Sequence, residues 1–241
     1  MKNSYETKIV VRDTDIDFKY AVPVTHVMRM LQDTAFKHAD GLGLDHRSMM
    51  RDSNAFWVIT KMKLRLLSDL KQFDKVKLLT WMQTPSGVRT ERDFKIKRNN
   101  ETVMEACAEW CCLDGETRKL RKMSSIRFPK ISMKAKEKLS LTYTNVREKV
   151  DENDFCYKRK ILSTDIDVNY HTNNLRYNFF ALDAFSVEEL LSMEIKEYEI
   201  HFVSECREGD ELKIYKKKLD YGILVEGQTN GKTVFRSIFK V

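Results

Sequence analysis

Apolar residues recur at helical spacing in two segments, one in each half of the chain. Steps of three and four residues between apolar positions are typical of an amphipathic helix. Runs of strand-like and hairpin-like pattern surround both segments. We therefore expect each half to contain one strand, one long apolar helix and about four antiparallel strands. The apolar positions are Val27, Met28, Met30, Leu31 and Ala35 in the first segment and Leu175, Phe179, Leu182 and Phe185 in the second.

The two halves also repeat one another in sequence. The letters TDID occur at Thr14–Asp17 and at Thr164–Asp167, and Tyr20 then aligns with Tyr170. Further on, residues 60–76 align with residues 196–212, so the offset changes from 150 to 136 residues. An internal repeat indicates a duplicated structural unit. The second alignment places Ser68 over Ser204, Asp69 over Glu205 and Asp74 over Asp210.

Short polar motifs mark where the expected elements begin and end. The letters RNNE and TNGK suit tight hairpin turns. Thr25, and either Asn173 or Asn174, are expected to cap the two helices, and Gly41 is expected to end the first one.

A helix that is apolar on most of its sides is normally buried. A sheet wrapped around one such helix is the hotdog arrangement, so we expect an α+β double hotdog of two fused units. The expected boundaries are residues 1–130 for the N-terminal hotdog, 131–152 for a linker and 153–241 for the C-terminal hotdog. The linker contains a polar stretch, Ser132–Glu152, that looks helical.

Composition narrows the class of protein. The chain has 241 residues, no apolar run long enough to span a bilayer and no pattern of a secretory signal. Five cysteines, an odd number, indicate free thiols in a reducing, cytoplasmic compartment. Cysteine spacing does not fit a zinc site, and DIDVNY lacks the glycine and glutamate of a calcium loop. We expect no metal and no cofactor.

The net charge of +7 favours an acidic partner, although a lysine-rich solvated surface explains it equally well. That plainer interpretation is the default for Lys216–Lys218. No nucleic-acid-binding motif is present, so nucleic acid is not an expected partner.

Three polar residues alternate on the approach to the second helix. Asp167, Asn169 and His171 are two residues apart, so in an extended segment their side chains project to the same side. The helix that follows begins with unpaired N–H groups and a dipole that favour a developing negative charge. Such a wall suits the polarisation of a carbonyl group.

These residues also resemble the acyl-acyl-carrier-protein thioesterases of plants and bacteria. The segment from Asp167 to Tyr177 is similar to the family's D-x-N-x-H-x-N-N-x-K-Y, with arginine in place of lysine. Glu205-Cys206-Arg207 is similar to the family's E-C-R, and Phe56–Lys63 to its W-V-x-T-R-M segment. The resemblance covers almost the whole chain and implies the double hotdog.

When the family's catalytic residues are matched to this sequence one by one, the resemblance implies a catalytic set of Asp167, Asn169, His171 and Glu205. Cys206, the residue after Glu205, is a further candidate. It also implies that the N-terminal hotdog forms much of an acyl-chain pocket. The first copy has Lys19 and Ala21 where the second has Asn169 and His171, so we expect the first copy to be catalytically degenerate. The candidate substrate-binding residues are Asn174, Arg176, Trp57 and Thr60.

Two mechanisms remain open at this point. In the preferred one Glu205 acts as general base on water, sharing that role with Asp167, while His171 and Asn169 orient the carbonyl or the water. In the other, His171 activates Cys206 as a nucleophile.

The expected activity is hydrolysis of fatty acyl-acyl-carrier protein to free fatty acid, which terminates fatty acid synthesis. The expected partner is the acyl carrier protein with its phosphopantetheine-linked chain. The alternatives are an acyl-coenzyme A thioesterase, a hotdog dehydratase acting on 3-hydroxyacyl thioesters, and a non-catalytic acyl binder. Chain length, saturation and oligomeric state, a homodimer included, are not readable from the sequence.

Overall fold

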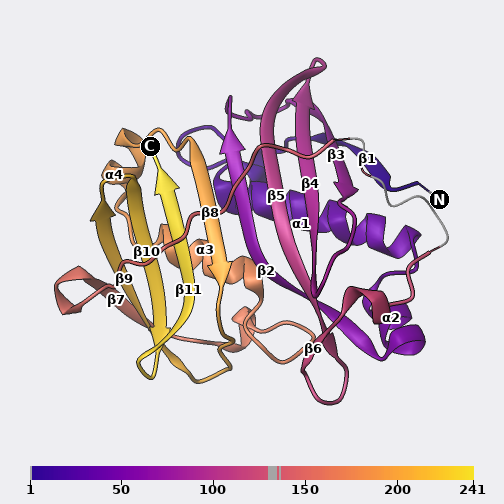
Figure 1. The fold of residues 1–241 in the computed structure, drawn as a ribbon. Helices are drawn as coiled ribbons and strands as arrows, with labels where there is room; N and C mark the ends of the chain where they lie inside the picture. Colours follow the sequence, from indigo (N-terminus) through magenta and orange to yellow (C-terminus); the bar gives the residue numbers. More distant parts are fainter. Residues whose placement is uncertain (1, 130–134, 136) are drawn as a thin grey trace. The chain divides into compact units, whose positions relative to one another are not determined.

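A computed structural model describes residues 2–129, 135 and 137–241 (Figure 1). The chain forms two compact units, residues 1–141 and residues 142–241. Each unit contains a set of antiparallel strands and its own helices.

The sheet of the first unit follows the strand order β1-β3-β4-β5-β2, with the short β6 paired to β5. Helix α1 (Val24–Gly41) contacts β1 and β3, and Figure 1 shows it running across the sheet. The buried side of α1 contains all the apolar positions predicted for it. A second helix, α2, spans His46–Ser53. The strands are β1 (Ser4–Val10), β2 (Ala55–Leu66), β3 (Lys75–Met82), β4 (Arg89–Arg98), β5 (Glu101–Asp114) and β6 (Leu120–Arg121).

The sheet of the second unit has the same path, β7-β9-β10-β11-β8. Its helices are α3 (Asn174–Leu182) and α4 (Val187–Ser192), and α3 contacts β10 and β11. The same order of one strand, a helix and further strands in both units is the predicted α+β double hotdog. The strands are β7 (Phe155–Lys160), β8 (Glu197–Phe202), β9 (Glu211–Leu219), β10 (Gly222–Thr229) and β11 (Lys232–Lys240).

The predicted hairpin turns are present in both units. Asn99 and Asn100 turn β4 into β5 with φ of 52° and 68°. Asn230 and Gly231 turn β10 into β11 with φ of 50° and 70°. Asparagine and glycine tolerate this left-handed conformation, which a two-residue turn between twisted strands requires.

The second central helix is shorter than predicted. Helix α3 ends at Leu182, and the expected continuation through Phe185 does not form. A new helix starts instead, because Ser186 and Glu189 form a reciprocal capping box at the start of α4. The Phe185 ring packs against Phe239, with ring centroids 5.0 Å apart. A capping signal inside an apolar periodic segment therefore divides it into two helices.

The predicted helix caps are only partly correct. Asn173 is the N-cap of α3, as expected, and its side chain accepts a hydrogen bond from the Leu175 N–H at 2.9 Å. Thr25 lies inside α1, whose N-cap is Pro23. The first helix ends at Gly41, as expected.

The helix expected in Ser132–Glu152 does not form in its described part. Residues 137–151 have no helix, while residues 132–134 and 136 lie outside the described residues. Tertiary contacts explain the extended backbone. In the first unit Leu139 and Leu141 are buried, and in the second unit the Thr144 N–H donates to the Glu199 carboxylate at 2.7 Å. In a helix the Thr144 N–H would bond to a backbone carbonyl of the helix, whereas here a side chain on β8 accepts it.

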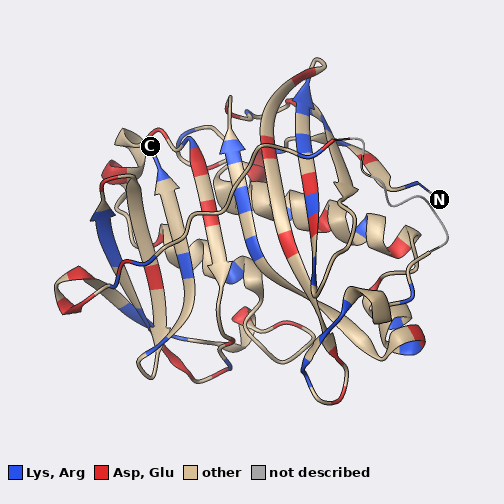
Figure 2. Ribbon diagram, viewed as in Figure 1, with Lys and Arg blue, Asp and Glu red and all other residues tan. Residues whose placement is uncertain are grey.

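The run Lys216–Lys218 lies on β9, where Figure 2 shows a blue stretch. The Lys216 ammonium pairs with Glu189 at 2.7 Å, and the Lys217 ammonium pairs with Asp154 at 3.0 Å. These contacts favour the interpretation of this run as an ordinary ion-paired surface. Among the residues that the structure describes, no helix is both long and apolar enough to cross a membrane.

One buried carboxyl group makes the stability of the first unit depend on pH. Asp93 lies on β4 and is buried. Its carboxylate accepts hydrogen bonds from the Leu139 N–H at 3.2 Å and from the Gln83 side-chain amide at 2.6 Å. Burial raises the pKa of this carboxyl group to about 6, despite those two donors. Since the folded state holds the proton more tightly, this group's stabilising contribution is complete below pH 4 and is lost as pH rises through 6.

We expect Asp93→Asn to unfold at higher urea concentration than the wild type at pH 8, by about 1–3 kcal/mol in free energy of unfolding. The difference should shrink as pH falls toward 4, because the wild-type group is then protonated. Glu91→Gln on the same strand is the matched control, since Glu91 forms a surface pair with Lys138. That control should change stability by less than about 1 kcal/mol. A destabilised Asp93→Asn variant at pH 8 would contradict the argument.

Candidate active site

The repeated TDID letters form the same backbone turn in both units. The Asp17 carboxylate accepts the Lys19 N–H at 2.8 Å, and the Asp167 carboxylate accepts the Asn169 N–H at the same distance. Each turn is closed by a hydrogen bond from the aspartate N–H to the carbonyl four residues on, which belongs to His171 in the second unit. The Asp167 carboxylate thus performs in the second unit the bracing that Asp17 performs in the first.

The other aspartate of each TDID motif, Asp15 or Asp165, is buried and joins the turn to neighbouring elements through ion pairs and hydrogen bonds. Asp165 is fully buried and pairs with Arg159 at 2.8 Å and with Arg176 at 2.7 Å. It also accepts the Leu162 N–H at 3.0 Å. In the first unit Asp15 makes similar contacts with one arginine instead of two, pairing with the Arg29 side chain at 2.8 Å and accepting the Arg12 N–H at 2.9 Å. The predicted substrate-binding Arg176 is therefore held by a structural carboxylate.

The segment after the turn is bound to the loop that follows β8. Thr172 donates to the Cys206 carbonyl twice, from its N–H at 2.9 Å and from its hydroxyl at 3.1 Å. In the first unit the Val22 N–H donates to the Leu70 carbonyl at 2.8 Å. Leu70 and Cys206 differ by 136 residues, so the structure confirms the predicted offset at this point.

This register brings two predicted site residues together. The His171 Nε2 atom lies 3.0 Å from the Glu205 Oε2 atom. The His171 side chain is 13% exposed and the Glu205 side chain is 49% exposed, so the pair is accessible from the carboxylate side. The equivalent positions in the first unit are Ala21 and Asp69. The imidazole–carboxylate pair is thus the chemical difference between two matching turns.

Cys206 is adjacent to this pair in sequence but is directed into the core. Its side chain is fully buried, as is that of its counterpart Leu70. Burial raises the pKa of the Cys206 thiol to about 11. The Cys206 N–H donates to the Tyr177 hydroxyl at 3.1 Å. Tyr177, a residue of α3 for which the sequence predicted no role, therefore helps to fix the loop that holds Glu205.

The asparagines of the motif take different positions. Asn169 is exposed at the tip of the turn. Asn173 caps α3, and the Asn174 carbonyl accepts a hydrogen bond from the Asn178 side chain at 3.3 Å. The positive end of the α3 dipole accordingly lies just beyond His171.

Trp57 and Thr60 belong to the first unit, on β2. The Trp57 indole N–H donates to the Leu44 carbonyl at 3.0 Å. The Thr60 hydroxyl donates to the Glu109 carboxylate at 2.6 Å. The Trp57 ring packs against an apolar cluster of Leu42, Leu44, Met49, Ala55, Met82, Cys112, Met123 and Ile126.

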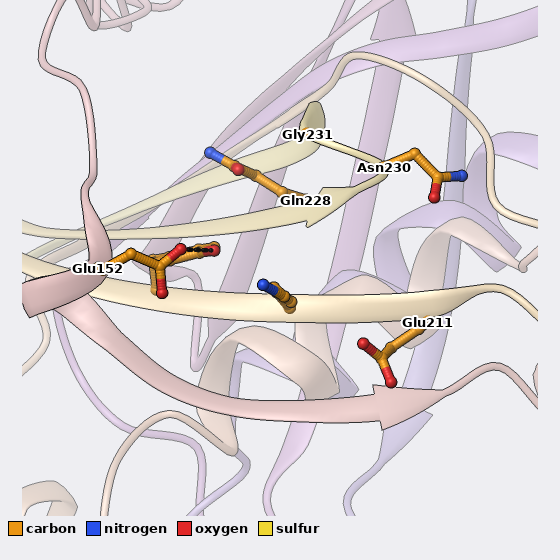
Figure 3. Close-up of a pocket in the computed structure, with 7 residues that line it drawn as sticks. Glu152, Glu211, Gln228, Asn230 and Gly231 are labelled. Atoms are coloured by element: carbon orange, nitrogen blue, oxygen red, sulfur yellow. Dashed lines mark hydrogen bonds between the residues drawn. The ribbon is translucent and has the colours of Figure 1, made fainter.

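A surface pocket of about 300 Å³ lies elsewhere on the second unit (Figure 3). The β9 residues that line it alternate with buried Leu212 and Ile214, so it lies on the opposite face of the sheet from them. None of the predicted site residues lines this pocket. Its lining residues are Glu152, Glu211, Lys213, Tyr215, Gln228, Asn230 and Gly231.

Chemically, the His171–Glu205 pair offers a proton acceptor at the protein surface beside the start of a helix. A half-exposed carboxylate that lies 3.0 Å from an imidazole nitrogen is suited to take a proton from water. A helix N-terminus nearby favours a carbonyl oxygen that gains negative charge.

Family models and curated relatives that match this chain all belong to one family. A family model described as the acyl-ACP thioesterase N-terminal domain matches residues 2–126, and one described as the C-terminal domain matches residues 148–237. The oleoyl-acyl carrier protein thioesterase of Coriandrum sativum is 25% identical over 232 residues, which cover 86% of this chain and 60% of that protein. The palmitoyl-acyl carrier protein thioesterase of Arabidopsis thaliana is 25% identical over 214 residues, covering 81% and 50%. The chain thus spans between half and three fifths of these curated relatives.

Solved structures support the fold. An acyl-ACP thioesterase from Bacteroides thetaiotaomicron superposes with a TM-score of 0.88 at 23% identity, covering 99% of this chain and 97% of that one. The 12:0-ACP thioesterase from Umbellularia californica superposes with a TM-score of 0.81 at 16% identity, covering 100% and 97%. With family models matching both halves and this fold in common, the chain belongs to the acyl-ACP thioesterase family.

Proposed function

We propose that the chain hydrolyses the thioester of a fatty acyl-acyl-carrier protein, releasing free fatty acid and carrier protein, and so ends fatty acid synthesis. The observation that carries this proposal is the 3.0 Å contact between His171 and Glu205. This pair forms in the copy of the turn that matches the family's motif, whereas the other copy has Ala21 and Asp69.

In the proposed mechanism Glu205 takes a proton from a water molecule that attacks the thioester carbonyl. A C–O bond forms, and the carbonyl oxygen gains negative charge in the tetrahedral intermediate. The C–S bond then breaks, and the proton held by Glu205 passes to the leaving thiolate. Because the Glu205 carboxylate lies 3.0 Å from His171 Nε2, the imidazole helps to set the direction of the carboxylate.

Asn169 and Asp167 have supporting roles in this proposal. The Asn169 amide is exposed at the tip of the turn and is suited to donate to the thioester oxygen. The Asp167 carboxylate is already engaged by the Asn169 N–H, as Asp17 is by Lys19. We therefore assign Asp167 to positioning the turn rather than to a share of the proton transfer.

The buried thiol of Cys206 favours the water route over covalent catalysis. A pKa of about 11 leaves roughly one thiolate in ten thousand at pH 7. The position also matches Leu70, a core residue in the unit without the pair. We propose that Cys206 fills space beneath the loop that carries Glu205.

The division of labour between the halves is part of the same proposal. Residues 1–130 would supply the acyl-pocket half, with Trp57 and Thr60 as candidate contacts, 131–152 the linker and 153–241 the catalytic half. Asn174 and Arg176 would act through the structure of α3. The five free cysteines support a reducing compartment, and the curated plant relatives are named as chloroplastic.

Glu205→Gln is expected to lower kcat by about 10²–10⁴-fold, because the amide cannot accept the proton from water. The measurement is thiol release from a panel of acyl-carrier proteins and the matched acyl-coenzyme A esters. Asp69→Asn changes the equivalent residue of the first unit and is the matched control, with activity expected to stay at the wild-type value.

If the wild type released thiol from neither set of esters, the thioesterase proposal would be wrong. Equal or faster release from coenzyme A would change the carrier in the proposal.

Cys206→Ala is expected to keep kcat within about threefold of the wild type, because water rather than sulfur attacks the carbonyl. Intact-mass measurement of acid-quenched turnover mixtures should detect no acyl adduct on the wild-type chain. A folded Cys206→Ala variant that loses more than about a hundredfold in kcat, together with an acyl adduct on Cys206, would establish the covalent route instead.

A further inference from the structure

Two large apolar side chains project into solvent on either side of Asn169. Val168 is 91% exposed and Tyr170 is 84% exposed. Both lie in the turn that leads to His171, two residues at most from a member of the candidate site. Adjacent apolar side chains that are this exposed commonly mark an interaction surface.

The turn presents these side chains in a fixed geometry. The Asn169 N–H donates to the Asp167 carboxylate at 2.8 Å, and the Tyr170 N–H donates to the Asp167 carbonyl at 3.0 Å. The Asp167 N–H in turn donates to the His171 carbonyl at 2.9 Å. Tyr170 has φ of 61°, an uncommon conformation for a bulky residue, and these bonds hold it there. A surface that is ordered before contact loses little entropy when a partner binds.

The position of the turn limits what can cover it. A partner seated permanently on Val168 and Tyr170 would also cover Asn169, which lies between them, and would stand next to His171, the following residue. A second copy of the chain on this surface would thus occupy the surroundings of the candidate site permanently. A partner that arrives with the substrate and leaves with the product avoids this conflict.

We propose that Val168 and Tyr170 form an apolar docking contact for the protein part of the acyl carrier protein. This inference rests on the proposed function, in which the carrier delivers its thioester to His171 and Glu205. Exposed charges on the neighbouring loop are mixed, with Arg207 close in sequence to Glu205 and Glu208. The apolar turn, rather than net charge, distinguishes this surface.

The first unit provides an internal control. Phe18 and Tyr20 occupy the same turn positions as Val168 and Tyr170, and they are 45% and 77% exposed. Tyr20 has φ of 55°, so its backbone matches that of Tyr170. This turn has no imidazole–carboxylate pair, so a carrier docked on it would gain nothing from the contact.

The test compares Val168→Ser/Tyr170→Asn with Phe18→Ser/Tyr20→Asn. Asparagine tolerates positive φ, so both double variants keep the turn conformation. One substrate is an acyl-acyl-carrier protein, and the other is the same acyl group on free pantetheine. For the first double variant we expect KM for the acyl-carrier protein to rise about tenfold. Its kcat/KM for acyl-pantetheine should equal that of the wild type, and Phe18→Ser/Tyr20→Asn should alter neither substrate.

A second measurement separates docking from hydrolysis. Equilibrium binding of the carrier protein bearing only its pantetheine arm should weaken about tenfold in Val168→Ser/Tyr170→Asn, and the ratio should persist at high salt because the contact is apolar. An unchanged Kd overturns the docking contact even if the chain is a thioesterase. If Val168→Ser/Tyr170→Asn lost kcat/KM equally on the acyl-carrier protein and on acyl-pantetheine, the turn would belong to the chemistry instead of to docking. If both double variants lost activity on the acyl-carrier protein equally, the assignment of docking to the second turn would be overturned. If the wild type hydrolysed neither substrate, the proposed function would fail while the binding comparison still decided the docking contact.

Discussion

Two hydrogen bonds to one carbonyl group determine whether the candidate site exists. Thr172 donates to the Cys206 carbonyl from its N–H and from its hydroxyl, across 34 residues of chain. His171 and Glu205 immediately precede these two residues, so the bonds place their side chains within contact distance. A slip of one residue in either segment would direct one of the two side chains to the opposite side. The contact between these two side chains therefore depends on the backbone register that the Cys206 carbonyl fixes.

That register is supported by a buried carboxylate at the start of the turn. Removing a carboxylate from water is costly unless it is paired and hydrogen-bonded. Asp165 meets this condition through Arg159, Arg176 and the Leu162 N–H. The arginines come from β7 and α3, so the same ion pairs that stabilise the carboxylate also join the strand, the turn and the helix. Substituting Asp165 would consequently disturb the geometry of His171 without touching any substrate.

The repeat in the sequence was sufficient to predict the fold and the pairing of the turns, because both depend on local and periodic signals. It aligned Asp69 with Glu205, whereas the assignment of Glu205 to the site came from the resemblance to the family's E-C-R motif. It did not reveal that Cys206 is a core residue, although the alignment of Cys206 with Leu70 contains that information. The extended backbone after residue 136 was beyond sequence reasoning, since Leu139 and Thr144 are held by side chains distant in sequence. Tertiary contacts of this kind override a helical composition.

The duplication also shows whether the positive φ of Tyr170 is specific to the candidate site, because Tyr20 occupies the same turn position in the first unit. A tyrosine with positive φ beside a catalytic candidate would ordinarily suggest strain used in the reaction. Tyr20 has the same conformation in a turn without the pair, so the strain at Tyr170 belongs to the scaffold. Each unit compensates for it with the same hydrogen bonds to Asp17 or Asp167. The turn conformation therefore belongs to both units independently of the candidate site, and the second unit differs from the first by His171 in place of Ala21 and Glu205 in place of Asp69.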